Sequence, residues 1–183
     1  MLLVWLFLVR LFACWSTRTV FSPDEWFQSL EVAHLAVFGQ GTLTWEWTAE
    51  HPVRSVLHML LFAVPWKLLA VLGLDVDWVV LLVPGLVQAF VAALGDLALY
   101  RVAVSWFGAS DAKWSLLLHV STWSVWYCMA RTLSNSLEST LVLCVLWCLT
   151  TQRLGFAVVL MVSCVFVRPS SVVYWASWAA FQP

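Results

Sequence analysis

The chain has 183 residues, of which 63% are hydrophobic and only 10% charged, with a mean hydropathy of +0.91. A soluble domain carries about 25% charged residues, so this composition excludes a water-exposed globular domain and predicts an all-α polytopic membrane protein. The formal net charge of −1 leaves no basic field for nucleic acid. Five cysteines lie in or beside apolar runs without disulfide or metal-ligand spacing, and we expect small core residues: Cys14, Cys128, Cys144, Cys148 and Cys164.

The first membrane span is predicted over residues 1–21. Met1–Ser16 is apolar apart from Arg10, and a span of roughly 20 residues must extend beyond it. Because no basic segment opens the chain, we expect a retained span and not a cleaved signal peptide.

A long polar interruption follows, Thr17–Glu50, and it contains five acids. Within it, Ser22–Phe38 predicts an amphipathic helix, because Ser22 suits the N-cap and Glu25 the third position of a capping box. Apolar residues recur on one face of this helix and polar residues on another, which is typical of a helix lying in the membrane interface: Trp26, Leu30, Ala33 and Val37 against Asp24, Gln28, Glu31 and His34.

Val53–Leu74 is apolar but includes Arg54, His58, Pro65 and Lys67. We therefore expect an interfacial helical pair broken at Pro65, so that the whole of 22–75 forms one loop. The remaining elements are predicted as spans over 77–95, 114–130, 139–150 and 154–167, a surface helix over 96–108, and the start of another span over 172–183, all within a single transmembrane domain.

Charges at the ends of these spans assign each connection to a side of the membrane. Arg131 and Arg168 fall on the side of the 22–75 loop. By the positive-inside rule the opposite side is cytoplasmic, since it holds the short basic connections: Arg101, Lys113 and Arg153. The acidic loop is then lumenal or extracellular, provided that Val53–Leu74 does not cross the membrane.

Asp24 and Glu25 are adjacent carboxylates at a predicted helix start, and either could act as a general base toward an attacking hydroxyl. Glu25 also has an ordinary structural role in the capping box, and an acid in the first turn stabilises the helix dipole. This leaves Asp24 as the preferred catalytic candidate.

Other candidate binding residues lie at the edges of the predicted spans. Arg131 could bind a lipid phosphate, pair with Glu138 or anchor a helix end. Arg168 could do the same or act as a snorkelling anchor. The indoles near Glu46 could pack on a sugar ring or anchor the interface. The predicted substrate-binding set is Trp45, Glu46, Trp47, Arg54, Arg131, Asn135, Glu138 and Arg168, and no metal site is predicted.

Four separated motifs follow one another along the chain: Phe-Ser-Pro-Asp-Glu-Trp-Phe-Gln-Ser-Leu-Glu-Val-Ala-His (21–34), Leu-Thr-Trp-Glu-Trp-Thr (43–48) followed by Arg54-Ser55, Arg-Thr-Leu-Ser-Asn-Ser-Leu-Glu (131–138), and Arg168-Pro169. Together they resemble the dolichol-phosphate-mannose-dependent α-mannosyltransferases of the endoplasmic reticulum, which have the GT-C membrane fold. The first two motifs most resemble the branch that builds the GPI anchor. One departure is Ser22, which stands where the family often has histidine before Pro-Asp-Glu.

The resemblance implies a lumenal first loop that carries the catalytic aspartate at Asp24, with Glu25 beside it. It implies inverting transfer of mannose from dolichyl phosphate mannose to a GPI-precursor glycolipid, in α-1,2 linkage as the third mannose, without a cofactor. The implied partners are this lipid-linked donor, the glycolipid acceptor and membrane lipids, and the oligomeric state stays open. Because family members are several times longer, the resemblance also implies that this chain is an N-terminal part.

Three alternatives remain open on the sequence. One is a mannosyltransferase that acts on the lipid-linked oligosaccharide of N-glycosylation. Another is a transporter piece, which requires charges near the middle of spans, where only Arg10 is expected. The last is a truncated, non-catalytic membrane protein.

Overall fold

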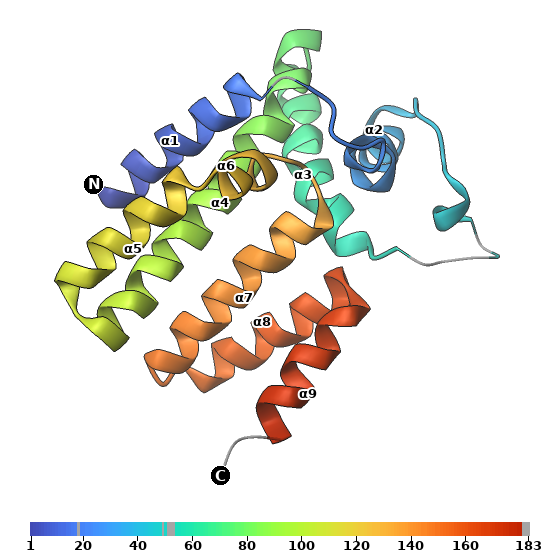
Figure 1. Cartoon of the computed structure of the whole chain (residues 1–183). Helices are drawn as coiled ribbons and strands as arrows, with labels where there is room; N and C mark the ends of the chain where they lie inside the picture. The colour runs from blue at the N-terminus through green and yellow to red at the C-terminus, as the bar shows by residue number, and fades with distance from the viewer. Residues whose placement is uncertain (18, 49, 51–53, 181–183) are drawn as a thin grey trace.

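The computed structural model describes residues 1–17, 19–48, 50 and 54–180, and within these ranges the chain is helical without a strand (Figure 1). The all-α class is therefore confirmed. The helices in chain order are α1 (Leu2–Ser16), the π-helix η1 (Trp26–Leu30), α2 (Glu31–Phe38), the 3-10 turn η2 (Trp45–Trp47), α3 (Val56–Leu72), α4 (Asp77–Phe107), α5 (Ala109–Ser121), α6 (Trp123–Met129), α7 (Ser134–Thr150), α8 (Leu154–Val167), the 3-10 turn η3 (Pro169–Ser171) and α9 (Val172–Ala180).

Helix α4 is the centre of the bundle, and α1, α3, α5 and α7 all pack against it (Figure 1). Small buried residues let these neighbours approach closely. At Gly95 a Cβ atom would lie 2.9 Å from Thr140 Oγ1 of α7, so any larger residue there would force the two helices or the Thr140 side chain to shift. Helix α8 packs on α7, while η1 and α2 lie to one side of the bundle against α3.

Two expected helix boundaries are wrong. The separate surface helix over 96–108 does not form, because α4 continues unbroken to Phe107. Pro65 does not break α3, which runs through it to Leu72. A proline inside a helix costs about 3 kcal/mol, and burial of the residues around it against α2 and α4 offsets that cost: Phe62, Ala63 and Trp66.

The predicted span over 114–130 contains a break that the sequence pattern did not indicate. Thr122 adopts an extended conformation, with φ −68° and ψ 123°, between the end of α5 and the start of α6. Helix α8 has the bounds of the predicted span over 154–167, and α7 starts five residues before its predicted span, at Ser134. Of the predicted final span over 172–183, the last three residues lie outside the described chain.

Among the described residues, α4 by itself has the length and apolar character needed to cross a bilayer. A second crossing is reached only by counting α6 and α7 together, and this pair is bent by 111°. Helices α1, α3 and α8 are apolar but shorter. The multi-pass arrangement therefore remains a prediction.

An ion cluster lies in the middle of the bundle, away from the loop. Arg10 of α1 donates two hydrogen bonds of 2.7 Å to Asp96 of α4, and both side chains have 0% exposure. His119 of α5 places Nε2 at 3.1 Å from the same carboxylate. The expectation that only Arg10 would lie near the middle of a span is wrong, since Asp96 lies opposite it and neutralises it. Arg10 and Asp96 therefore compensate each other's charge inside the bundle.

Candidate active site

The loop helix begins at Asp24, two residues after the predicted start at Ser22. The Ser22 hydroxyl accepts a hydrogen bond from the Asp24 amide at 3.3 Å. The Glu25 carboxylate reaches back to accept from the amides of Phe21 at 2.9 Å and Ser22 at 3.4 Å. The structural role of Glu25 at the helix start is therefore confirmed, although the Ser22 hydroxyl bonds the amide of Asp24 and not that of Glu25.

The expected continuous α-helix over 22–38 is instead interrupted by the π-helical turn η1. The chain then continues as α2 and ends at Gly39, which adopts a left-handed conformation with φ 74°. A π-helical turn carries an extra residue, so it rotates the side chains that follow relative to those at the helix start.

Arg131, in the connection between α6 and α7, holds the start of the loop. Its terminal nitrogens donate to the Thr19 carbonyl and to the Thr19 hydroxyl, the latter at 3.1 Å, and it pairs with Glu25 at 3.5 Å. The guanidinium also lies 4.3 Å from the centre of the Tyr127 ring. The neighbouring Thr132 hydroxyl donates to the Glu25 carbonyl at 3.0 Å. Loop and connection therefore lie on one side of the bundle, as the charge argument predicts.

These contacts change the interpretation of Arg131. With its side chain only 5% exposed, Arg131 has both terminal nitrogens committed to Thr19 and Glu25. It is therefore better suited to fix the position of Glu25, and with it the helix start, than to bind a lipid phosphate. Glu138, which the sequence suggested as a partner for Arg131, pairs with Arg168 instead.

Arg168, Asn135 and Glu138 form a second network that ties the end of α8 to the start of α7. Arg168 pairs with Glu138 at 3.2 Å and donates to Asn135 Oδ1, and the Ser171 hydroxyl donates to Glu138. The structure thus brings these predicted residues together, on the same side of the bundle as Arg131. Arg168 keeps 31% side-chain exposure, so the network is open to solvent.

The remaining predicted substrate-binding residues lie near the end of the loop, before α3. Arg54 donates two hydrogen bonds to Glu46, at 3.0 and 2.9 Å, in a bidentate pair. The Trp47 indole donates to the Gln28 carbonyl at 3.2 Å, which fastens η2 to η1. Nearby, burial lowers the pKa of His58 to about 4, with a smaller contribution from Arg54, so this imidazole is uncharged at neutral pH.

Asp24 differs from Glu25 in its exposure and its contacts. Its side chain is exposed, and the structure shows no ion pair or side-chain hydrogen bond for it among the described residues. The Asp24 carboxylate is therefore exposed, whereas Glu25 is buried and paired.

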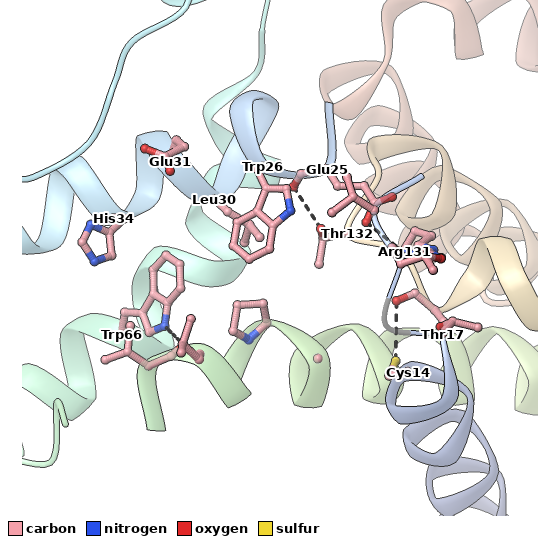
Figure 2. Close-up of a pocket in the computed structure, with 17 residues that line it drawn as sticks. Cys14, Thr17, Glu25, Trp26, Leu30, Glu31, His34, Trp66, Arg131 and Thr132 are labelled. Atoms are coloured by element: carbon pink, nitrogen blue, oxygen red, sulfur yellow. Dashed lines mark hydrogen bonds and ion pairs between the residues drawn. The ribbon is translucent and has the colours of Figure 1, made fainter. Parts of the chain in front are cut away.

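A cavity of about 430 Å³ opens between the loop helix, α3, α4 and the Arg131 connection (Figure 2). Glu25 and Trp26, the residues that follow Asp24, line it. Trp66 also lines it and is held by a hydrogen bond from its indole to the Val80 carbonyl at 2.9 Å. Trp45 and Trp47, the indoles predicted to contact sugar, do not belong to the lining. Sequence reasoning missed Trp66, since nothing in the local pattern separates it from the other tryptophans of the chain.

No group of three or more His, Cys, Asp or Glu side chains within the described ranges is placed to hold a metal ion.

Comparison with known proteins adds a family and its named members. The family model described as Alg9-like mannosyltransferase family matches residues 1–181. "Mannosyltransferase APTG1" of Arabidopsis thaliana is 39% identical over 86% of this chain and 30% of its own length. "GPI alpha-1,2-mannosyltransferase 3" of Danio rerio is 37% identical over 94% of this chain and 33% of its own length. "GPI mannosyltransferase 3" of Schizosaccharomyces pombe is 35% identical over 94% of this chain and 38% of its own length. The chain thus spans about a third of the length of these relatives. No solved structure matches it.

Proposed function

Because this chain belongs to the Alg9-like mannosyltransferase family, we propose that it transfers mannose from dolichyl phosphate mannose to a GPI-precursor glycolipid, as the third mannose in α-1,2 linkage. The observation that carries this proposal is that relatives named GPI α-1,2-mannosyltransferase 3 align over nearly the whole chain. The exposed carboxylate of Asp24, which directly precedes the cavity-lining residues Glu25 and Trp26 in the chain, supports the same chemistry.

The proposed reaction is a direct displacement with inversion. The acceptor hydroxyl oxygen forms a bond to the anomeric carbon of mannose as the bond from that carbon to the phosphate oxygen breaks. The electron pair leaves with dolichyl phosphate, and Asp24 takes the hydroxyl proton. Asp24 suits this role because its carboxylate is exposed and does not have to break a protein contact first.

Cations must stabilise the departing phosphate, since no resident metal or other cofactor is proposed. Arg54 and Arg168 keep 27% and 31% side-chain exposure while paired with carboxylates, so each can still donate outward. Arg131 is less accessible, and we assign it to holding Glu25. Glu46 and Glu138 would orient these arginines, with Asn135 accepting from Arg168.

The function is tested by incubating membranes that contain the protein with radiolabelled dolichyl phosphate mannose and a dimannosylated GPI precursor. We expect one added mannose that an α-1,2-specific mannosidase removes. A labelled lipid-linked oligosaccharide of the N-glycan type would instead support the second candidate. Membranes from the same host without the protein provide the control.

We further propose that the protein is a multi-pass protein of the endoplasmic reticulum membrane, with the loop over 22–75 lumenal and the helix over 22–38 in the membrane interface. The contacts of Arg131 with Thr19 and Glu25 support a shared side for the loop and the α6–α7 connection. An N-glycosylation acceptor introduced between residues 39 and 43 should be modified in the endoplasmic reticulum, whereas one beside Asp111 should not. The reverse pattern would invert this topology.

A further inference from the structure

Gln88 is a buried amide within α4, the helix at the centre of the bundle. Its side chain has 0% exposure, and its Nε2 donates a hydrogen bond of 2.9 Å to the main-chain carbonyl of Met129. A polar side chain inside a membrane bundle is costly and is usually paired or functional. Gln88 does not belong to the lining of the cavity beside the loop helix, so any role in the site must pass through Met129.

Met129 ends α6, and the last carbonyls of a helix have no partner within it. Side chains from three other helices donate to the carbonyls at this point: Ser136 of α7 to Cys128 at 2.8 Å, Gln88 of α4 to Met129, and Cys14 of α1 to Ala130 at 3.5 Å. A thiol is a weak donor, and Ser136 follows Cys128 by only eight positions. The Gln88 amide is therefore the donor that ties the central helix to the end of α6.

The connection from α6 to α7 in turn holds the start of the loop helix, and Figure 2 shows Arg131 and Thr132 beside Glu25. Arg131 donates to Thr19 and pairs with Glu25, while the Thr132 hydroxyl donates to the Glu25 carbonyl. A single residue separates Met129 from Arg131 in the chain. A displacement of the Met129 carbonyl therefore moves the side chains that hold the helix start.

We infer that Gln88 is a positioning residue, which holds the start of the loop helix in place through the Met129 carbonyl and the α6–α7 connection. The inference rests on the proposed function, in which Asp24 takes the proton of the acceptor hydroxyl. Asp24 directly precedes Glu25, which the connection holds by both its side chain and its carbonyl. Since a misplacement of about 1 Å can lower a rate about 10²-fold, Gln88 affects the reaction although it lies outside the cavity.

The second polar atom of the Gln88 side chain separates this role from a contribution to overall stability. Gln88 Oε1 is buried and has no hydrogen-bond partner in the described part of the chain. Gln88→Met removes this unpaired acceptor and leaves the Met129 carbonyl without its donor, so one unsatisfied acceptor replaces another. Methionine is also unbranched and similar in length. We therefore expect the variant to keep the overall stability of the wild type while the loop helix loosens.

Thr140 of α7 provides a matched control. It is 4% exposed, and its hydroxyl donates to the Val91 carbonyl of α4 at 3.3 Å. Thr140→Val, like Gln88→Met, removes a buried hydrogen bond from a side chain to a main-chain carbonyl between neighbouring elements. The Val91 carbonyl belongs to α4 and not to the α6–α7 connection, so the start of the loop helix should not respond.

Hydrogen exchange of the 183-residue chain in lipid nanodiscs, read by mass spectrometry over residues 21–27, tests the inference without catalysis. Amides in this segment are protected by hydrogen bonds that close within the helix start. Gln88→Met should raise their exchange about fivefold, as expected for the loss of one neutral hydrogen bond, and Thr140→Val should leave it unchanged. Gln88→Asn should give the same rise if the methionine variant folds poorly, because its amide is one methylene too short to reach Met129.

A combined variant tests whether Gln88 acts through the connection. Arg131→Gln together with Thr132→Val removes the side-chain bonds to the helix start and should itself raise exchange over 21–27. Adding Gln88→Met should then cause no further rise, because the path is already broken. A further, additive rise would overturn the inference. Equal exchange in the wild type and Gln88→Met, or an equal rise in Thr140→Val, would also overturn it.

The rate of mannose transfer supplies the catalytic readout. Gln88→Met should lower kcat about tenfold and change KM for either lipid by less than about twofold, because a displaced Asp24 impairs proton transfer and not substrate binding. An unchanged kcat, or a raised KM in its place, would overturn the positioning role. If the wild type transfers no mannose, the proposed function fails, while the exchange result still decides whether Gln88 holds the helix start.

Discussion

Asp24→Asn is expected to lower mannose transfer by about 10²–10⁴-fold, because the amide cannot accept the proton of the acceptor hydroxyl. The change keeps the size and shape of the side chain. The Asp24 side chain is exposed and makes no ion pair or hydrogen bond within the described ranges, so the fold should persist. The loss should appear in the initial rate of mannose transfer at saturating donor and acceptor.

Asp111→Asn is the matched control for Asp24→Asn. Asp111 is also an exposed acid in the first turn of a helix, but it lies at the start of α5, away from the cavity. Any small cost from losing a favourable dipole interaction is therefore common to both variants. Equal transfer rates in the two variants would remove Asp24 from the reaction.

Glu25→Gln separates the roles of the two adjacent acids. Glutamine retains an oxygen that can accept from the amides of Phe21 and Ser22, although it loses the ion pair with Arg131. Retained transfer in this variant assigns Glu25 to structure, whereas a loss as large as that of Asp24→Asn assigns both carboxylates to the reaction.

Asp96→Leu is expected to lower the free energy of unfolding by about 3–5 kcal/mol, because it leaves the Arg10 guanidinium buried without its carboxylate partner. Both side chains have 0% exposure, so solvent cannot replace the lost contact. The effect should be measured in detergent micelles, by following helical circular dichroism during unfolding with sodium dodecyl sulfate.

The double variant Arg10→Met with Asp96→Leu should recover most of this stability, since it removes both charges and leaves apolar side chains of similar volume. Arg101→Met provides a control in the same helix, because Arg101 is exposed and its removal should change little. If the double variant is as unstable as the sum of the two single variants, the ion pair is not the cause.

Much of the candidate site follows from local chemistry and was therefore predictable. Ser22 and Glu25 lie three residues apart at a helix start, and their hydrogen bonds close within that turn. The sidedness of Arg131 and Arg168 follows from the alternation of polar connections and apolar segments. The motifs around Asp24 and Arg131 resemble an α-mannosyltransferase family, and the comparisons confirm it.

The partners of the charged residues were not predictable, because they join segments far apart in the chain. Glu25 and Arg131 are separated by 106 positions, and Arg10 and Asp96 by 86. The spacing of residues in the sequence contains no information about such pairs, since only the packing of helices decides which faces meet.

The sequence by itself determined the apolar composition, the all-helical class, the hydrogen bonding of Ser22 and Glu25 near the helix start, and the family. These depend on hydropathy, on contacts within one turn and on motifs read along the chain. Only the tertiary structure decided that α3 passes through Pro65, that α4 continues past Asp96, and that Trp66 lines the cavity. In each case, burial against a distant helix outweighs a local preference that would otherwise break the helix or expose the side chain.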